Sequence, residues 1–334
     1  MLKNVDARGS GEMLEFELDG KAQQADWAWH RGEHCNFNPA RANLQTGEDV
    51  LKYVLAGWAP PSPLIEPATR VTAFGSCFAG NISVWLADRN FTVLNKDQRS
   101  DAHIVRMAEG MVNTFAIAEQ FRWALEGVRY EGEFWHGYDA KAFGYSEDIR
   151  LATREILLST DVFIITLGLS EIWYDEVTGG VFWRAVPRQM VDPERHKFRV
   201  ATFAENKSNI ETICRLISEH RPGAKIIFTV SPIPLVATFR PNSCLVSNSA
   251  SKALLRGAVD EVYREWPARD LVYYWPAYEI VLDVFDNRWK RDRRHPRREI
   301  LDFIMTAFEH AWCRGHEPGM SVDEAFARAR QATR

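Results

Sequence analysis

The sequence predicts an α/β fold of three layers, α/β/α, with a central parallel sheet and insertions. Two continuous apolar runs, 161–167 and 225–230, have the composition of strands that are buried on both faces of a parallel sheet. A helical pattern precedes each run, and a further strand at 271–275 also follows a helix. Strands that alternate with helices favour one parallel sheet, joined by right-handed crossovers and covered by helices on both faces.

Length and composition are those of one large globular domain. The chain has 334 residues, of which 46% are hydrophobic and 26% charged, so it can bury a large core. A formal net charge of −4 argues against a general polyanion binder, and we expect no nucleic-acid partner. We divide the chain into an N-terminal arm at 1–69 that packs on the main domain, the main domain at 70–315, and a C-terminal tail at 316–334.

The cysteines and histidines indicate neither a disulfide framework nor a metal centre. The cysteines are odd in number and lack Cys-x-x-Cys spacing, at Cys35, Cys77, Cys214, Cys244 and Cys313. This pattern favours a reducing compartment, and no signal-type segment or run of about 18 apolar residues is present. We therefore expect a cytoplasmic protein without a membrane span. We also expect no metal and no cofactor, since partly buried polar side chains explain His30, His34 and Cys35.

The stretch 70–80 predicts a strand, a tight turn and the start of a helix. Gly75 and Gly80 allow the backbone to turn sharply and to approach a ligand closely. The first amides of the following helix favour negative charge in the turn. We therefore predict that Ser76 is a nucleophile held in that field.

Further elements follow along the chain. A helix is expected to begin at Asn113 or Thr114 and to end at Gly127. Asn113 fits two roles, as the cap of this helix or as an amide donor to an oxyanion. Residues 128–150 are aromatic and glycine-rich and predict an insertion over one rim of the sheet, and 173–202 predicts a hairpin with 178–180 at its tip.

Candidate ligand-binding residues follow the second and third buried strands. Gly168 and Ser170 come after the second strand, and Ser231 comes after the third. Ligands of α/β sheets bind at the carboxyl ends of strands, so we expect these residues near the site. Asn248 and Lys252 are further candidates. A turn for Ser231, a helix cap for Asn248 and a surface charge for Lys252 are nevertheless simpler explanations than a role in substrate binding.

A short spacing near the C-terminus predicts an acid–base pair. Pro296 suits the first position of a helix and keeps His295 out of helical backbone, so His295 is expected on a loop. Asp292, three residues earlier, can accept a hydrogen bond from the imidazole, fix its tautomer and stabilise the imidazolium. The alternative is a solvated basic loop, because seven Arg and Lys residues lie between Arg288 and Arg298.

The motif Gly-Ser-Cys-Phe-Ala at 75–79 resembles the motif that names the GSCFA family, within the SGNH/GDSL-like hydrolase superfamily. Other stretches that resemble this family are FNPARANLQTGEDV, TLGLSEIWYDE, TVSPIPLVATF, SNSASKALLR, and RRHP before FIMTAF. The likeness covers roughly 27–312 of the chain. It implies a flavodoxin-like SGNH fold and O-ester chemistry, often on carbohydrates.

The resemblance also assigns roles, with Ser76 as nucleophile, His295 as base and Asp292 as its orienting group. The chain departs from the superfamily at two points: no Asp precedes the serine, and the Gly-x-Asn-Asp block reads Gly-Leu-Ser-Glu at 168–171. Since the oxyanion-binding Asn is missing there, the Ser76 amide must be joined by other donors. Asn113 is the first candidate and Ser170 the second.

These features give a leading hypothesis and three alternatives. The leading one is a serine hydrolase that acts on O-acyl esters, such as O-acetyl esters, of a carbohydrate or related metabolite. The alternatives are an O-acyltransferase that modifies a glycan, a variant with Cys77 as the nucleophile, and a non-catalytic carbohydrate-binding protein on a hydrolase fold. Cys77 is otherwise expected at the site beside Ser76, and the oligomeric state is not predicted.

Overall fold

The computed structural model describes residues 13–18, 21–26, 36, 38–96, 100–106, 110–129, 134–136, 140–268 and 270–333. The chain divides into two units, 1–45 and 46–334. In the first unit, β1 (Met13–Leu18) and β2 (Lys21–Asp26) form an antiparallel pair, followed by the short 3-10 helix η1 (Arg41–Asn43). His30, His34 and Cys35, predicted to be partly buried polar side chains and not metal ligands, lie outside the described residues.

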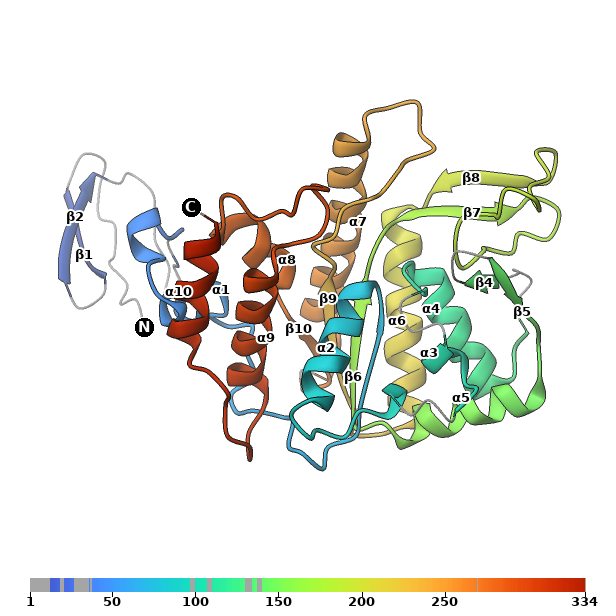
Figure 1. Ribbon diagram of the computed structural model, residues 1–334, viewed down its shortest axis with the longest axis horizontal. Coiled ribbons are helices and arrows are strands. Elements are labelled where there is room, and N and C mark those ends of the chain that lie inside the picture. The colour runs from blue at the N-terminus through green and yellow to red at the C-terminus, as the bar shows by residue number, and fades with distance from the viewer. Residues whose placement is uncertain are drawn as a thin grey trace. The chain divides into compact units, whose positions relative to one another are not determined.

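The second unit is built around a four-stranded parallel sheet, which confirms the predicted α/β class (Figure 1). Its strands are β3 (Val71–Gly75), β6 (Val162–Leu167), β9 (Lys225–Val230) and β10 (Val272–Tyr274), in the spatial order β10-β9-β6-β3. An isolated parallel bridge joins Val71 to Val93 beside β3. The Asn95 side chain bonds the backbone N–H of Ala73 at 3.1 Å and its carbonyl at 2.7 Å. Backbone groups of this edge strand are therefore satisfied.

Helices cover both faces of the sheet (Figure 1). On one face lie α2 (Cys77–Ala87) and α9 (Arg298–Trp312), and on the other α4 (Thr114–Phe121), α6 (Phe203–His220) and α7 (Cys244–Glu265). Neighbouring strand residues show the alternation: the ring of Tyr273 meets Trp312 of α9 at 5.4 Å, whereas Tyr274 joins the core cluster that includes Leu255 of α7. The sheet is thus the middle layer of three.

The remaining elements connect or border these layers. They are α1 (Gly47–Val54), η2 (Leu94–Lys96), α3 (His103–Arg106), η3 (Arg122–Glu126), β4 (Phe134–His136), β5 (Lys141–Phe143), α5 (Glu147–Ser159), β7 (Glu171–Asp175), β8 (His196–Val200), α8 (Ala277–Glu279), η4 (Ile280–Val284) and α10 (Val322–Ala332). No helix in the part of the chain that the structure describes is both long enough and apolar enough to cross a bilayer. None of the four cysteines described, Cys77, Cys214, Cys244 and Cys313, forms a disulfide.

The predicted hairpin is more elaborate than its sequence suggests. The tight turn does occur at the expected place, where Gly179 N–H donates to Asp175 O at 2.7 Å. The chain then makes only a single bridge back, from Tyr174 to Val181, and the full antiparallel partner of β7 is β8, after a long connection. Two segments therefore pair with β7, a single residue at Val181 and the whole of β8.

A buried carboxylate joins α2 to the C-terminal part of the chain. Glu309 of α9 is 2% exposed and accepts the indole N–H of Trp85 at 2.7 Å. It also pairs with Arg89 at 2.9 Å and with His316 at 2.5 Å. Residues after 315, predicted as a tail, thus include a partner of this carboxylate, and α10 packs on α9 through Phe326 and Phe303 with ring centroids 5.2 Å apart.

Gly75 ends β3 at a point where no other residue fits. Its φ is +129°, and a Cβ there would collide with the carbonyl oxygen of Thr166 on β6 and lie 2.9 Å from the carbonyl carbon. Both the backbone conformation and the contact with the neighbouring strand therefore require glycine. This close approach lets Ser76 begin α2 directly beside the end of β6.

Replacement of Gly75 by alanine is expected to destabilise the fold more than a comparable change elsewhere. Gly179 also has positive φ, +74°, but a Cβ at this residue would have no neighbour within 4 Å. Urea unfolding should show a loss of about 1 kcal/mol for Gly179→Ala and about 3 kcal/mol or more for Gly75→Ala. Equal losses would mean that contact with β6 does not constrain the turn.

Candidate active site

A pocket of about 590 Å³ opens at the carboxyl ends of three parallel strands. Ser76 follows β3, Gly168 follows β6 and Ser231 follows β9, and all three line it. Backbone hydrogen bonds fix these ends to one another, from Ser76 N to Thr166 O at 3.2 Å and from Ser231 N to Leu167 O at 2.8 Å. The strands thus bring together three predicted residues that are distant in sequence.

Ser76 is the N-cap of α2 and is 6% exposed. Its Oγ accepts a hydrogen bond from Phe78 N at 3.2 Å, so its oxygen lies at the positive end of the helix. The hydroxyl proton takes no part in this bond and remains available to a base. Cys77, the alternative nucleophile, also lines the pocket.

Asn113 lines the pocket and combines the cap role with a free amide. Its Oδ1 accepts from Ala116 N at 2.8 Å at the start of α4, and the residue is 3% exposed. The preceding carbonyl, of Val112, accepts from Gly168 N at 2.8 Å and Leu169 N at 3.2 Å, which holds this loop against the end of β6. Since the cap fixes the oxygen, the Nδ2 donors are left over, and no described residue accepts from them.

Asp292 and His295 form the predicted pair. The His295 Nδ1 and Asp292 Oδ2 lie 2.5 Å apart, and the other carboxylate oxygen accepts the backbone N–H groups of Arg294 at 3.0 Å and His295 at 3.1 Å. The hydrogen bond to His295, followed by those two backbone bonds, lowers the pKa of Asp292. Arg293 adopts positive φ, +56°, which closes the loop so that the two side chains meet. The carboxylate therefore orients the ring through Nδ1.

The pair stands next to the pocket, without a direct bond to the serine. Arg294, between Asp292 and His295, lines the pocket, and its Nε donates to Pro234 O at 3.3 Å. Within the described residues, no hydrogen bond joins Ser76 to His295. Both side chains of the pair are about half exposed, at 44% for His295 and 46% for Asp292. Among the described residues, none forms a hydrogen bond with the Nε2 atom of His295.

Two residues that were predicted at the site, Ser170 and Asn248, do not line the pocket but hold together the elements around it. Ser170 is 1% exposed, its N–H donates to Ser251 Oγ at 2.7 Å, and its own hydroxyl donates to Ser251 O at 3.0 Å. Asn248 accepts the N–H of Leu235 at 3.0 Å through Oδ1. Both contacts tie α7 to loops at the ends of β6 and β9.

Lys252 of α7 is buried, at 1% exposure, and does not lie at the surface as its charge alone suggested. Its Nζ donates to Gly168 O at 2.6 Å. Burial lowers the pKa of Lys252 to about 7, an effect that nearby Cys77 opposes and Arg294 reinforces. A sequence signal for this burial exists, because Lys252 lies three and seven residues before the core residues Leu255 and Val259.

The far wall of the pocket was not predicted from sequence. It consists of five aromatic residues from the β7–β8 hairpin and the β9–α7 loop, Trp173, Phe182, Trp183, Phe198 and Phe239. Trp173 meets Phe239 edge-on, with ring centroids 4.8 Å apart. Glu171 is the acidic residue on this lining, and both of its carboxylate oxygens lie within 2.9 Å of the Thr238 hydroxyl. The lining of the pocket therefore combines aromatic rings with polar side chains.

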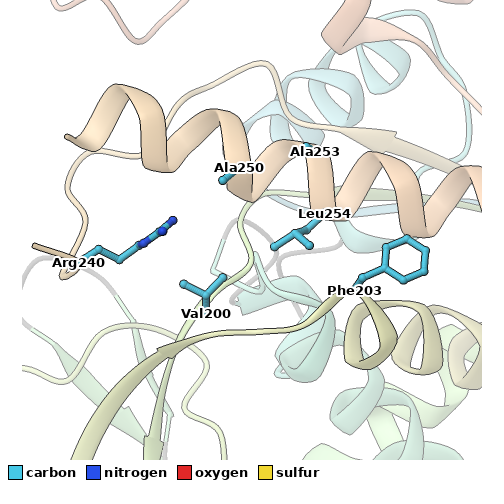
Figure 2. A pocket seen from close by; sticks show the side chains of 6 residues that line it. All are labelled: Val200, Phe203, Arg240, Ala250, Ala253 and Leu254. Carbon is cyan, nitrogen blue, oxygen red and sulfur yellow. The ribbon is translucent and has the colours of Figure 1, made fainter. Parts of the chain in front are cut away.

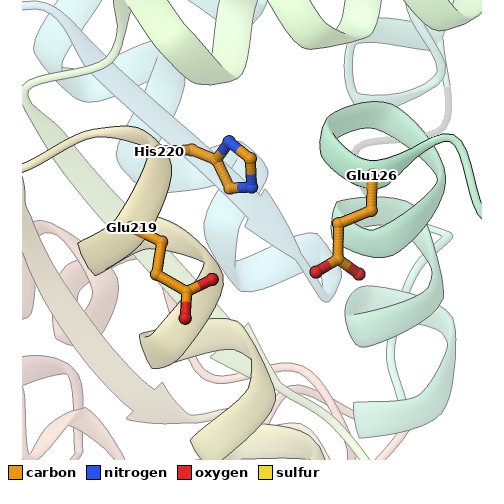
Figure 3. Close-up of side chains that lie close together, drawn as sticks. All are labelled: Glu126, Glu219 and His220. Atoms are coloured by element: carbon orange, nitrogen blue, oxygen red, sulfur yellow. The ribbon is translucent and has the colours of Figure 1, made fainter.

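Elsewhere in the described part of the chain, one group has ligand atoms close enough to hold a metal ion (Figure 3). It consists of Glu126, Glu219 and His220, whose ligand atoms lie within 4.8 Å of one another. Arg215 pairs with Glu126 at 3.2 Å and with Glu219 at 2.5 Å. Since the Arg215 guanidinium already pairs with both carboxylates, an ion-pair cluster between two helices explains the group.

The model of the GSCFA family matches residues 70–308. This span runs from the residue before β3 into α9, so it contains the parallel sheet, the Ser76 turn and the Asp292–His295 loop. A search of curated proteins finds no match.

Buried Lys252 should make stability depend on pH. Its pKa falls from 10.5 to about 7 in the folded chain, so the unfolded chain binds more protons between those values, and stability rises with pH there. Lys252→Met lacks this contribution. The unfolding free energy of wild type relative to the variant should therefore increase from about pH 7 to about pH 10, by at most about 1.4 kcal/mol per unit. A difference that stays constant in urea titrations across that window would contradict the assignment.

Proposed function

Because this chain belongs to the GSCFA family and holds a serine at a helix N-terminus inside a pocket, we propose that it is a serine hydrolase of SGNH type. Its substrates are O-acyl esters, such as O-acetyl esters, of a carbohydrate or related metabolite. Ser76 is the nucleophile, His295 the base and Asp292 the residue that orients the base. One observation carries the proposal. Ser76 lines the same pocket as Arg294, which lies in sequence between Asp292 and His295, and these two residues are hydrogen-bonded to each other.

The proposed reaction uses each group in turn. His295 Nε2 takes the hydroxyl proton of Ser76, and Oγ attacks the ester carbonyl. The oxyanion accepts a hydrogen bond from the Nδ2 of Asn113, and such a donor typically contributes about 10²–10³ in rate. The Ser76 amide, predicted to share this role, donates to Thr166 O instead. The imidazolium then protonates the leaving alcohol. Water, deprotonated by His295, hydrolyses the acyl-enzyme and restores Ser76.

Two further features support this assignment. The segment at Val93 forms a parallel bridge to β3 on the side away from β6. If this segment is counted as a strand, the strand order matches that of flavodoxin-like sheets, which bind ligands at the carboxyl ends of their strands. Lys252 and Arg294 add positive charge near the α2 N-terminus, which favours a developing oxyanion. Catalytic hydrogen bonds commonly tighten only when substrate binds, so a loose serine–histidine geometry is compatible with this mechanism.

The lining of the pocket suggests how the substrate sits. Its aromatic side chains offer flat apolar surfaces to a sugar ring or an acyl group, and Glu171 offers an acceptor to a hydroxyl. The ester carbon must lie within reach of the Ser76 Oγ, and its oxygen within reach of Asn113, which line the same pocket.

A non-catalytic binding protein on the same fold is the second candidate. It is favoured by the Ser76 Oγ, which already accepts from Phe78 N, and by the lack of a bond from Ser76 to His295 among the described residues. A fluorophosphonate probe separates the two candidates, because it reacts with an activated serine and not with a serine that only caps a helix.

We expect the probe to label wild type at Ser76 and to leave Ser76→Ala unlabelled. On short p-nitrophenyl esters, Ser76→Ala and His295→Ala should each lower kcat/KM by about 10³-fold or more, since the two act as a unit. Ser231→Ala is the control: this serine lines the same pocket but has no proposed chemical step, so the loss should stay below about tenfold.

An unlabelled wild type, or a Ser76→Ala protein with wild-type ester hydrolysis, would overturn the proposal. Product analysis with a glycan acceptor added to the same reaction distinguishes hydrolysis from acyl transfer.

A further inference from the structure

We propose that a face beside the pocket mouth docks on an anionic lipid surface. This docking face consists of residues 234–246, in the β9–α7 connection and the start of α7, and of residues 288–298, which lead into α9 and include its first residue (Figure 1). The proposal does not depend on ester hydrolysis, since a binding protein with the same face would dock equally well.

Exposed apolar side chains are concentrated on the docking face. Ten large hydrophobic side chains are exposed in the described part of the chain, and four of them fall within 236–246. These four are Val236 at 76%, Phe239 at 54%, Leu245 at 69% and Val246 at 67%. Single exposed apolar residues are normal at a protein surface, whereas a local concentration marks a surface that meets something apolar.

Hydrogen bonds hold the two segments of the docking face together. Arg294 donates from Nε to Pro234 O at 3.3 Å, which joins the basic loop to the apolar loop. Asn248 accepts the N–H of Leu235 at 3.0 Å, which joins the apolar loop to the first turns of α7. The apolar and basic segments are therefore neighbours on the molecule.

The charge of the docking face selects the partner. Its two segments contain eight Arg and Lys residues and one acidic residue, Asp292, although the whole chain has a net charge of −4. Among the described residues no carboxylate pairs with Arg240, which lies in sequence between the exposed Phe239 and Leu245, whereas Arg298 pairs with Asp302 at 3.8 Å. The N-cap of α7, Ser243, makes no side-chain cap bond, so this end of the helix adds positive potential.

A shallow apolar groove adjoins the unpaired arginine (Figure 2). It has a volume of about 490 Å³ and is lined by Val200, Phe203, Arg240, Ala250, Ala253 and Leu254. Figure 2 shows the Arg240 side chain at one end of this opening, with Leu254 and Phe203 toward the other. A cation at the mouth of an apolar groove suits a lipid that has an anionic head group and an acyl chain.

An anionic lipid surface meets both requirements at once. Apolar side chains insert at the level of the head groups, while each Lys or Arg near an anionic leaflet contributes electrostatic attraction. Val236 and Phe239 line the pocket as well as the docking face, so a docked molecule would present its pocket mouth to the lipid.

Vesicle flotation of the full chain tests this inference. Vesicles of phosphatidylcholine with about 30% phosphatidylserine should carry the protein at about 0.1 M salt, and vesicles of phosphatidylcholine alone should carry far less. Raising salt to about 1 M should release most of the bound protein, because the charges are exposed.

Variants separate the two contributions. Arg240→Gln should weaken partition about fivefold, the effect expected for one cation near the surface. Leu245→Ser with Val246→Ser should weaken it at least as much through lost insertion. Leu151→Ser on α5, 47% exposed, and Arg188→Gln, also exposed, lie outside the docking face and should leave partition unchanged.

Three outcomes would overturn the inference. The first is no flotation with either vesicle. The second is equal losses for docking-face variants and controls. The third is self-association in sedimentation that Leu245→Ser with Val246→Ser abolishes, without vesicle binding, since the occupant would then be a second copy of the chain. Ester hydrolysis measured on soluble substrates decides the proposed function separately.

Discussion

The close approach of β3 to β6 at Gly75 is the constraint on which the site depends. Without a side chain at this position, the backbone turns against Thr166 and Ser76 N donates to the Thr166 carbonyl. Ser76 is thereby fixed as the N-cap of α2, at the positive end of the helix dipole. Its Oγ accepts the N-cap hydrogen bond from Phe78 N, and since this bond does not use the hydroxyl proton, the proton is available for chemistry.

Helix α7 connects this geometry to the rest of the pocket. Through Lys252 and Ser251 it holds Gly168 and Ser170, so the end of β6 cannot move independently of the helix. The same helix begins at the docking face, where its first turn is tied to the β9–α7 loop through Asn248. One element therefore supports the polar end of the pocket and the surface beside its mouth.

Local sequence patterns predicted the parallel strands, the Ser76 turn and the contact between Asp292 and His295, because each depends on residues that are close along the chain. The burial of Lys252 was not predicted, because a charged side chain is normally exposed and this expectation was preferred to the helical spacing that places Lys252 on the face of the core residues. The aromatic wall could not be predicted, since Trp173 and Phe239 are brought together only by the packing of a hairpin against a distant loop. Whether His295 reaches Ser76 likewise depends on how two distant loops pack.

The distance between Ser76 and His295 in a covalent adduct tests the central claim most directly. A crystal structure of the phosphonylated protein should show phosphorus on the Ser76 Oγ and the His295 Nε2 within roughly 3.2 Å of an oxygen of the adduct. The phosphoryl oxygen should accept a hydrogen bond from the Nδ2 of Asn113, as expected of an oxyanion site. Phosphorus on another residue, or a His295 ring turned away to solvent with no contact to the adduct, would contradict the account.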